Sequence, residues 1–151
     1  MRIERGELAA PEAQALIEAL NAELTLRYPE DGATHFRLEP EEVAPGRGVF
    51  LVAYVEDEAV GCGAVRLLGG EGAEIKRMYV REAARGRGVG RAMLAALEAE
   101  ARALGARRLL LETGERQHEA ICLYESAGFV RIERFGEYVD SPLSVCMAKE
   151  L

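Results

Sequence analysis

Three glycines within six residues, where a strand-like run gives way to a helical pattern, constrain the fold of this chain most. The segment Arg85-Gly86-Arg87-Gly88-Val89-Gly90 follows an apolar run that ends at Val80 and opens a helical pattern that ends at Leu104. Glycines permit positive φ angles and let successive N–H groups come close to a ligand. The N-terminus of the following helix adds the positive end of its dipole. The segment therefore predicts a strand, an anion-binding loop and a helix in succession.

The distribution of charge points to the same loop. The formal net charge is -7, yet Arg85, Arg87 and Arg91 gather in and beside the glycines. An acidic chain with basic residues at one loop is unsuited to general nucleic-acid binding, which requires lysines and arginines over a broad face. We therefore expect a small phosphate-bearing ligand and no nucleic-acid partner.

Length and composition indicate one globular domain that spans residues 1–151. Hydrophobic residues make up 49% of the chain and charged residues 30%, as in ordinary folded proteins. The first seven residues are largely charged and lack the apolar core of a signal peptide. No apolar run is long enough for a membrane span. These features predict a cytoplasmic protein with no membrane partner.

Cysteines and histidines are few and scattered. Cys62, Cys122 and Cys146 are widely spaced and lie in apolar runs, so we expect reduced thiols in the core. His35 and His118 lie near no cysteine pair and form no recognised zinc motif. The sequence therefore predicts no metal site.

Hydrophobic periodicity and turn residues divide the chain into a regular series of elements. Expected helices cover residues 11–27, 40–43, 89–104 and 117–127, and expected strands cover 2–6, 49–55, 59–68, 73–80, 107–112, 129–134 and 144–149.

The order β-α-βββ-α-β-α-ββ predicts a mixed α/β domain whose central sheet is mostly antiparallel and is flanked by helices. The helix at 89–104 joins two strands as a crossover, so these two strands should pair in parallel. Leu109-Leu110-Leu111 is a continuous apolar run, typical of a strand that is buried on both faces.

Two motifs in this order resemble those of the GNAT superfamily of acyl-CoA-dependent N-acyltransferases. Arg85, Gly88 and Gly90 match the family's pyrophosphate motif, after a strand that ends in Met78-Tyr79-Val80. The segment from Leu123 to Phe129 is similar to the family's Leu-Tyr-x-x-x-Gly-Phe motif. The resemblance covers nearly the whole chain. It departs from the family at Gln117, where asparagine is common, and at Ala83-Ala84, where proline is common.

The resemblance implies acetyl-CoA as cosubstrate and no metal. The backbone of the strand end would bind the pantetheine arm, the glycine loop would bind the pyrophosphate, and the polar side chain before the third long helix would touch the cofactor. The implied cofactor-binding residues are Met78, Tyr79, Val80, Arg85, Gly86, Arg87, Gly88, Val89, Gly90, Arg91 and Gln117.

The resemblance also implies two catalytic residues. Tyr124 would be the general acid that protonates the departing thiolate, although its spacing equally suits a packed core aromatic. Glu74 would be the base, with Glu112 as the reserve candidate. The alternatives for Glu74 are a base made of ordered water and backbone carbonyls, and a surface ion pair of Glu74 with Lys76 or Arg77.

The acceptor is expected to be a primary amine of a small molecule or peptide. By resemblance, two loop regions would build its pocket: one with Tyr28, His35 and Phe36, the other with Tyr138 and Asp140. Two other functions stay open at this point, a non-catalytic acyl-CoA-binding sensor and a protein lysine or N-terminal acetyltransferase. The family also suggests a homodimer.

Overall fold

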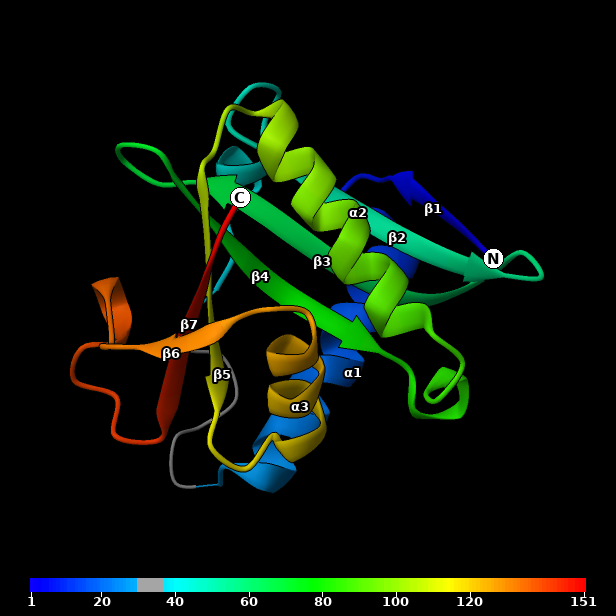
Figure 1. Ribbon diagram of the computed structural model, residues 1–151. Coiled ribbons are helices and arrows are strands. Elements are labelled where there is room, and N and C mark those ends of the chain that lie inside the picture. Colours follow the sequence, from blue (N-terminus) through cyan, green and yellow to red (C-terminus); the bar gives the residue numbers. More distant parts are fainter. Residues whose placement is uncertain (30–36) are drawn as a thin grey trace.

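A seven-stranded mixed sheet runs through the protein in the computed structural model, which describes residues 1–29 and 37–151. The expectations for His35 and Phe36 lie outside the described residues. The strand order is β1-β2-β3-β4-β5-β7-β6, as Figure 1 shows. The strands are β1 Arg2–Arg5, β2 Gly48–Val55, β3 Glu58–Leu67, β4 Gly72–Val80, β5 Arg108–Gly114, β6 Val130–Ile132 and β7 Ser144–Glu150.

The predicted mixed α/β fold is confirmed. β4 and β5 pair in parallel and every other neighbouring pair is antiparallel. The described α-helices are α1 Pro11–Arg27, α2 Val89–Ala103 and α3 His118–Ser126, and the short 3₁₀ helices are η1 Pro40–Val43, η2 Glu82–Ala84 and η3 Gly136–Tyr138. Each expected helix and strand is present, with ends that differ by a few residues at most.

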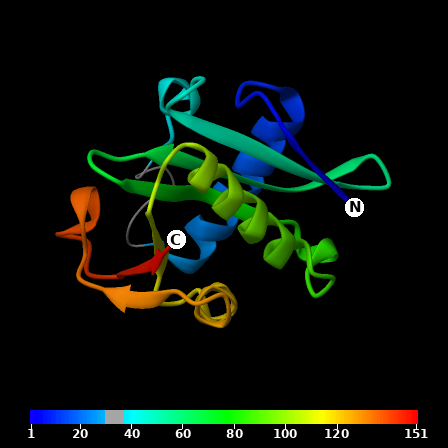
Figure 2. The same cartoon turned by 45° about the horizontal axis from the view of Figure 1, so that its top comes forward.

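The sheet is covered on both faces, as Figures 1 and 2 show. Successive side chains of one strand point to opposite faces of the sheet, so alternate residues pack into the cores on the two faces. Leu51 and Ala53 face the core beneath α2, whereas Phe50 and Val52 face the core beneath α1. Gly63 permits the close approach of α2, because a Cβ there would lie 2.8 Å from Leu97 Cδ1.

The strands β4 and β5 separate partway along their length, and this divergence opens the sheet (Figure 1). Their ladder runs from the pair Gly72 and Arg108 to the pair Ile75 and Leu111, although β4 continues to Val80 and β5 to Gly114. A parallel pair that stops early leaves the inner edges of both strands without a β-ladder partner beyond it. The opening therefore exposes backbone and side chains in the middle of the sheet.

A bulge in β4 lies at the start of this opening. The register with β3 shifts, so that Cys62 faces Tyr79 while Ala64 faces Lys76. Arg77, within the bulge, has a φ of 55°, in the left-handed region that side chains other than glycine rarely adopt. The bulge changes the direction in which the following residues point.

The cysteine prediction is right for two residues and wrong for the third. Cys62 and Cys146 are buried free thiols, but Cys122 is exposed. On α3 the buried positions are Ile121 and Tyr124, and Cys122 lies about 100° around the helix from Ile121. The described residues contain no group of three or more potential metal ligands and no helix long and apolar enough to span a membrane.

Candidate active site

The glycine loop forms the N-terminal boundary of α2. Gly86 and Gly88 have φ angles of 79° and 83°, and a Cβ at either would meet no atom within 4 Å. Backbone conformation, not crowding, therefore favours glycine at both positions. Gly88 is the N-cap of α2, whose first-turn N–H groups have no partner within the helix. The loop thus presents donors that suit an anion.

The three arginines of the loop differ in their contacts. Arg85 Nε donates to the carbonyl of Val80 at 2.9 Å, and its Nη2 lies 2.8 Å from Glu23 Oε1 on α1. This guanidinium also stacks over the Tyr79 ring. Arg87 and Arg91 are exposed. Arg85 therefore anchors the loop to α1, whereas Arg91 Nη2 donates to Ser126 Oγ on α3 at 3.4 Å.

A cavity of about 320 Å³ follows the loop. Its lining contains every predicted cofactor-binding residue except Arg87, together with Tyr124. Gly90 packs closely against α3, since a Cβ there would lie 3.2 Å from Leu123 Cδ2. The tertiary structure thus brings the strand end, the loop and the start of α3 together along one cavity.

A second cavity, of about 150 Å³, continues from the first into the opening between β4 and β5. The two cavities share Met78, Gln117 and Tyr124 among their lining residues. The second cavity is also lined by Tyr28 of the first predicted acceptor region and Tyr138 of the second. Asp140 is not among its described lining residues, whereas the neighbouring Ser141 is.

Tyr124 lies where the cavities meet. Its side chain is 7% exposed, and its hydroxyl is 3.9 Å from Met78 Sδ on β4. The ring packs edge-on against Phe129 at 5.9 Å. Burial raises the pKa of the Tyr124 hydroxyl to about 12, so the phenol stays protonated at neutral pH. Both expected properties, a core aromatic and a protonated phenol beside the cofactor cavity, are present in one side chain.

Glu112 lines the wall of the second cavity that β5 provides. Its Oε2 accepts a hydrogen bond of 2.5 Å from the Ser144 hydroxyl, and Ser144 Oγ is 2.7 Å from Ser141 Oγ. Burial raises the pKa of the Glu112 carboxyl to about 7; the Ser144 hydrogen bond opposes this rise and the Glu74 charge adds to it. At neutral pH this carboxyl can therefore either accept or release a proton.

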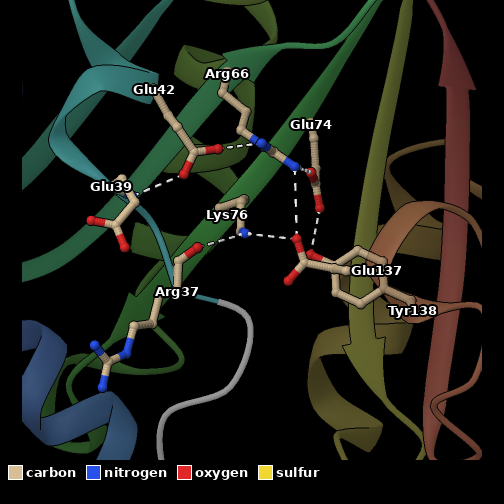
Figure 3. Close-up of polar contacts among 8 residues, drawn as sticks. All are labelled: Arg37, Glu39, Glu42, Arg66, Glu74, Lys76, Glu137 and Tyr138. Carbon is tan, nitrogen blue, oxygen red and sulfur yellow. Dashed lines mark hydrogen bonds and ion pairs between the residues drawn. The ribbon is translucent and has the colours of Figure 1, made fainter.

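Glu74 has a different environment (Figure 3). It is fully buried, with Oε1 accepting from Arg66 Nε at 3.0 Å and Nη2 at 2.7 Å, and Oε2 accepting from the Tyr138 hydroxyl at 2.6 Å. The alternative of a surface ion pair with Lys76 or Arg77 is wrong, because the carboxylate is enclosed and bonded to other partners. Glu74 is not among the described residues that line either cavity.

The ion-pair network around Glu74 fastens two loops to the sheet (Figure 3). Arg66 also binds Glu42 of η1, and Lys76 Nζ donates to the Arg37 carbonyl at 2.9 Å and lies 3.7 Å from Glu137 Oε2. Burial raises the pKa of the Tyr138 hydroxyl, and the charge of Glu74 and its hydrogen bond with this hydroxyl raise it further. The network thus holds the Tyr138 ring against the second cavity.

The sequence signals did not find this network or the bulge at Arg77. Arg66 and Glu74 are eight residues apart on two strands, and only the register of β3 with β4 makes them cross-strand partners. The left-handed φ of Arg77 has no glycine or asparagine to indicate it. The position of a carboxylate at the end of the buried strand made Glu112 only the reserve candidate for the base, behind Glu74.

A split parallel strand pair, a glycine loop at a helix start and a cavity that joins them define an acyl-CoA-dependent acyltransferase. The model of the Acetyltransferase (GNAT) family matches residues 13–129, so the chain belongs to this family. It is an N-acyltransferase.

Known proteins agree with this assignment. The chain is 43% identical to an IAA acetyltransferase from Azospirillum brasilense over 138 residues, which cover 90% of this chain and 88% of the relative. A crystal structure from Klebsiella pneumoniae, assigned as an acyl-CoA N-acyltransferase, has 37% identity and a TM-score of 0.83, with 99% and 97% of the two chains covered. PaiA N-acetyltransferase from Thermoplasma acidophilum, solved with coenzyme A, shares the fold at 17% identity, with a TM-score of 0.72 over all of both chains.

Proposed function

We propose that the protein transfers the acetyl group of acetyl-CoA to a primary amine of a small molecule, by direct attack of the amine on the thioester. The observation that carries this proposal is the meeting of two cavities at Tyr124, one along the glycine loop and one between β4 and β5. A donor and an acceptor that enter from opposite sides would meet at this point, as direct transfer requires.

The first cavity suits the cosubstrate. The pyrophosphate would bind the N–H groups of residues 86–91 at the start of α2, where the helix dipole favours an anion. The pantetheine arm would lie along Met78, Tyr79 and Val80, whose edge toward β5 is beyond the β-ladder and can pair with an amide chain as an added strand would. A backbone N–H of this segment would then donate to the thioester oxygen. The CoA complex of the Thermoplasma acidophilum structure supports this use of the fold.

Glu112 is our choice for the base, in preference to Glu74. A base must reach the ammonium group of the acceptor. Glu112 lines the second cavity, which we call the acceptor cavity, whereas Glu74 is enclosed by Arg66 and Tyr138. A base works best when its pKa is close to the operating pH, which matches a carboxyl pKa of about 7. Glu74 would instead position Tyr138.

Glu112 accepts a proton from the ammonium group and later releases it to solvent, and the neutral amine nitrogen then bonds to the thioester carbon. The C–S bond breaks, and the thiolate of CoA takes a proton from the Tyr124 hydroxyl. The excess proton of the new amide nitrogen is released to solvent, from which the tyrosinate recovers its own.

The test is a panel of amines, offered with acetyl-CoA, in which release of free thiol is followed. Acetylation of at least one small amine, abolished or strongly reduced in E112Q and Y124F, would support the proposal. Binding of acetyl-CoA without thiol release on any amine or peptide would favour the sensor function. Release only with proteins or peptides would favour a protein acetyltransferase and would contradict the small acceptor that a cavity of about 150 Å³ suggests.

A further inference from the structure

Arg77 is a partly buried cation whose described side-chain partner is neutral. Its Nη2 donates to the amide oxygen of Asn21 on α1. No carboxylate of the described residues lies within ion-pair distance of it, whereas Arg66 and Arg85 bind Glu74 and Glu23. Arg77 therefore differs from Arg66 and Arg85, whose charges are each compensated by a carboxylate.

Such an arrangement is unfavourable without a ligand. Burial disfavours a charge unless an opposite charge or several hydrogen bonds compensate it. Burial lowers the pKa of Arg77, but an arginine still remains protonated in proteins. The protein thus keeps an uncompensated positive charge beside the acceptor cavity, held there by the β4 bulge.

Arg77 also joins two cavities. It lines the acceptor cavity, and it lines a further cavity of about 240 Å³ beside α1. The other described polar lining residues of that further cavity are Gln14, Asn21 and Arg37, and its described lining contains no acidic residue. Figure 3 shows the Arg37 side chain extending toward α1. The described polar side chains of this space are therefore two arginines and two amides.

The opposite wall of the acceptor cavity has the opposite charge. The β4–β5 ladder ends at the pair of Ile75 and Leu111. Glu112 is one residue beyond Leu111 on β5, and Arg77 is two residues beyond Ile75 on β4. The diverging strands thus place Glu112 on the wall that β5 provides and Arg77 on the wall that β4 provides. A molecule with an amine and an anionic group fits both.

We infer that the acceptor is an amine that also carries a carboxylate, as amino acids do, and that Arg77 binds this carboxylate. A guanidinium and a carboxylate form two parallel hydrogen bonds, and a dry site strengthens them. This inference rests on the proposed function and names its substrate class.

The test compares amino acids with their primary amides, matched pairs that differ only in the carboxylate. In the wild type, kcat/KM should be at least roughly 10-fold higher for the preferred acid than for its amide. R77Q should remove this preference and leave turnover of the amide within a few-fold. R77K keeps the positive charge but cannot form two parallel hydrogen bonds with a carboxylate, so it should retain only part of the preference. R5Q, at an exposed arginine paired with Glu100, is the control for loss of a charge.

A second measurement does not depend on folding of the variants. The N-acetylated acid should inhibit the wild type more strongly than the N-acetylated amide. Equal use of acids and amides, equal inhibition by the two products, or a preference that survives in folded R77Q would overturn the inference. The inference would also be overturned if the enzyme preferred phosphoethanolamine to ethanolamine but showed no preference for acids over amides, because the anion that it recognises would then be a phosphate. Each of these results requires turnover of some amine, so it is distinct from failure of the proposed function, in which no amine releases thiol.

Discussion

Replacement of Glu112 by glutamine should change the pH dependence of stability as well as that of catalysis. Burial raises the pKa of this carboxyl from an ordinary 4.5 to about 7 in the folded protein. Each pKa unit corresponds to ~1.4 kcal/mol, so the shift is equivalent to about 3 kcal/mol of unfolding free energy. Glutamine has nearly the same shape but does not titrate, and it therefore isolates this contribution.

The direction of this pH dependence depends on whether the folded or the unfolded chain binds the proton of Glu112 more tightly. Folded Glu112 holds its proton more tightly than the unfolded chain does, so its contribution is fully present below about pH 4.5 and is lost as the pH rises through about 7. The unfolding free energy of E112Q, measured relative to wild type, should therefore increase by about 3 kcal/mol between pH 4 and pH 8. Urea denaturation of both proteins across this range measures the difference.

The same group should set the acidic limb of the rate. For an acceptor of fixed amine pKa, kcat/KM should rise with pH through a limb near 7, and E112Q should lose that limb and roughly 10²-fold or more of its rate. S144A should move the limb to higher pH, because the Ser144 hydrogen bond lowers the pKa of Glu112. E125Q, on the exposed surface of α3, is the control for exchange of a carboxyl for an amide. A stability difference that does not vary with pH would refute the reasoning about burial, and a limb that survives in E112Q would refute its role as base.

Three further predictions concern the cofactor cavity and the network behind the acceptor cavity. Y124F should bind CoA with near wild-type affinity in calorimetry but lower kcat by roughly 10²-fold, and an unchanged kcat at saturation would remove the general-acid assignment. G88A should weaken CoA binding and lower stability by about 1 kcal/mol, since alanine is strained at a φ of 83°; G69A, where a Cβ meets open space and φ is not positive, is its matched control. E74Q should lower the unfolding free energy by roughly 3 kcal/mol in urea, because it leaves the Arg66 guanidinium without its buried partner, and a variant as stable as wild type would mean that Glu42 and Glu137 suffice for Arg66.

Local patterns were enough to predict the elements of this fold. The helices at Pro11–Arg27 and Val89–Ala103 have apolar residues at helical spacing and breakers at their ends, and the parallel pairing of β4 with β5 follows from the crossover between them. The glycine loop was equally readable, because positive φ angles at Gly86 and Gly88 are a local requirement. In each case the physical cause lies within a few residues of the sequence that shows it.

The positions of the charged side chains were less predictable. Glu74 and Glu112 are both carboxylates on strands close to the predicted site, and their sequence contexts did not separate a buried structural anion from a carboxyl that lines a cavity. The register of β3 with β4 gives Glu74 to Arg66, and the loop of Tyr138 then covers it. Burial and electrostatics depend on residues far apart in the chain, so the sequence alone could not rank the two.

The sequence by itself determined the order of helices and strands, the anion-binding loop and the family motifs, because each depends on neighbouring residues. Only the tertiary structure decided that β4 and β5 part after Ile75 and Leu111, that Arg77 lies in a bulge and lines the opening, and that Glu112 lines the cavity while Glu74 does not. These features arise where strands distant in sequence meet, and the free energy of a charge depends on what surrounds it there.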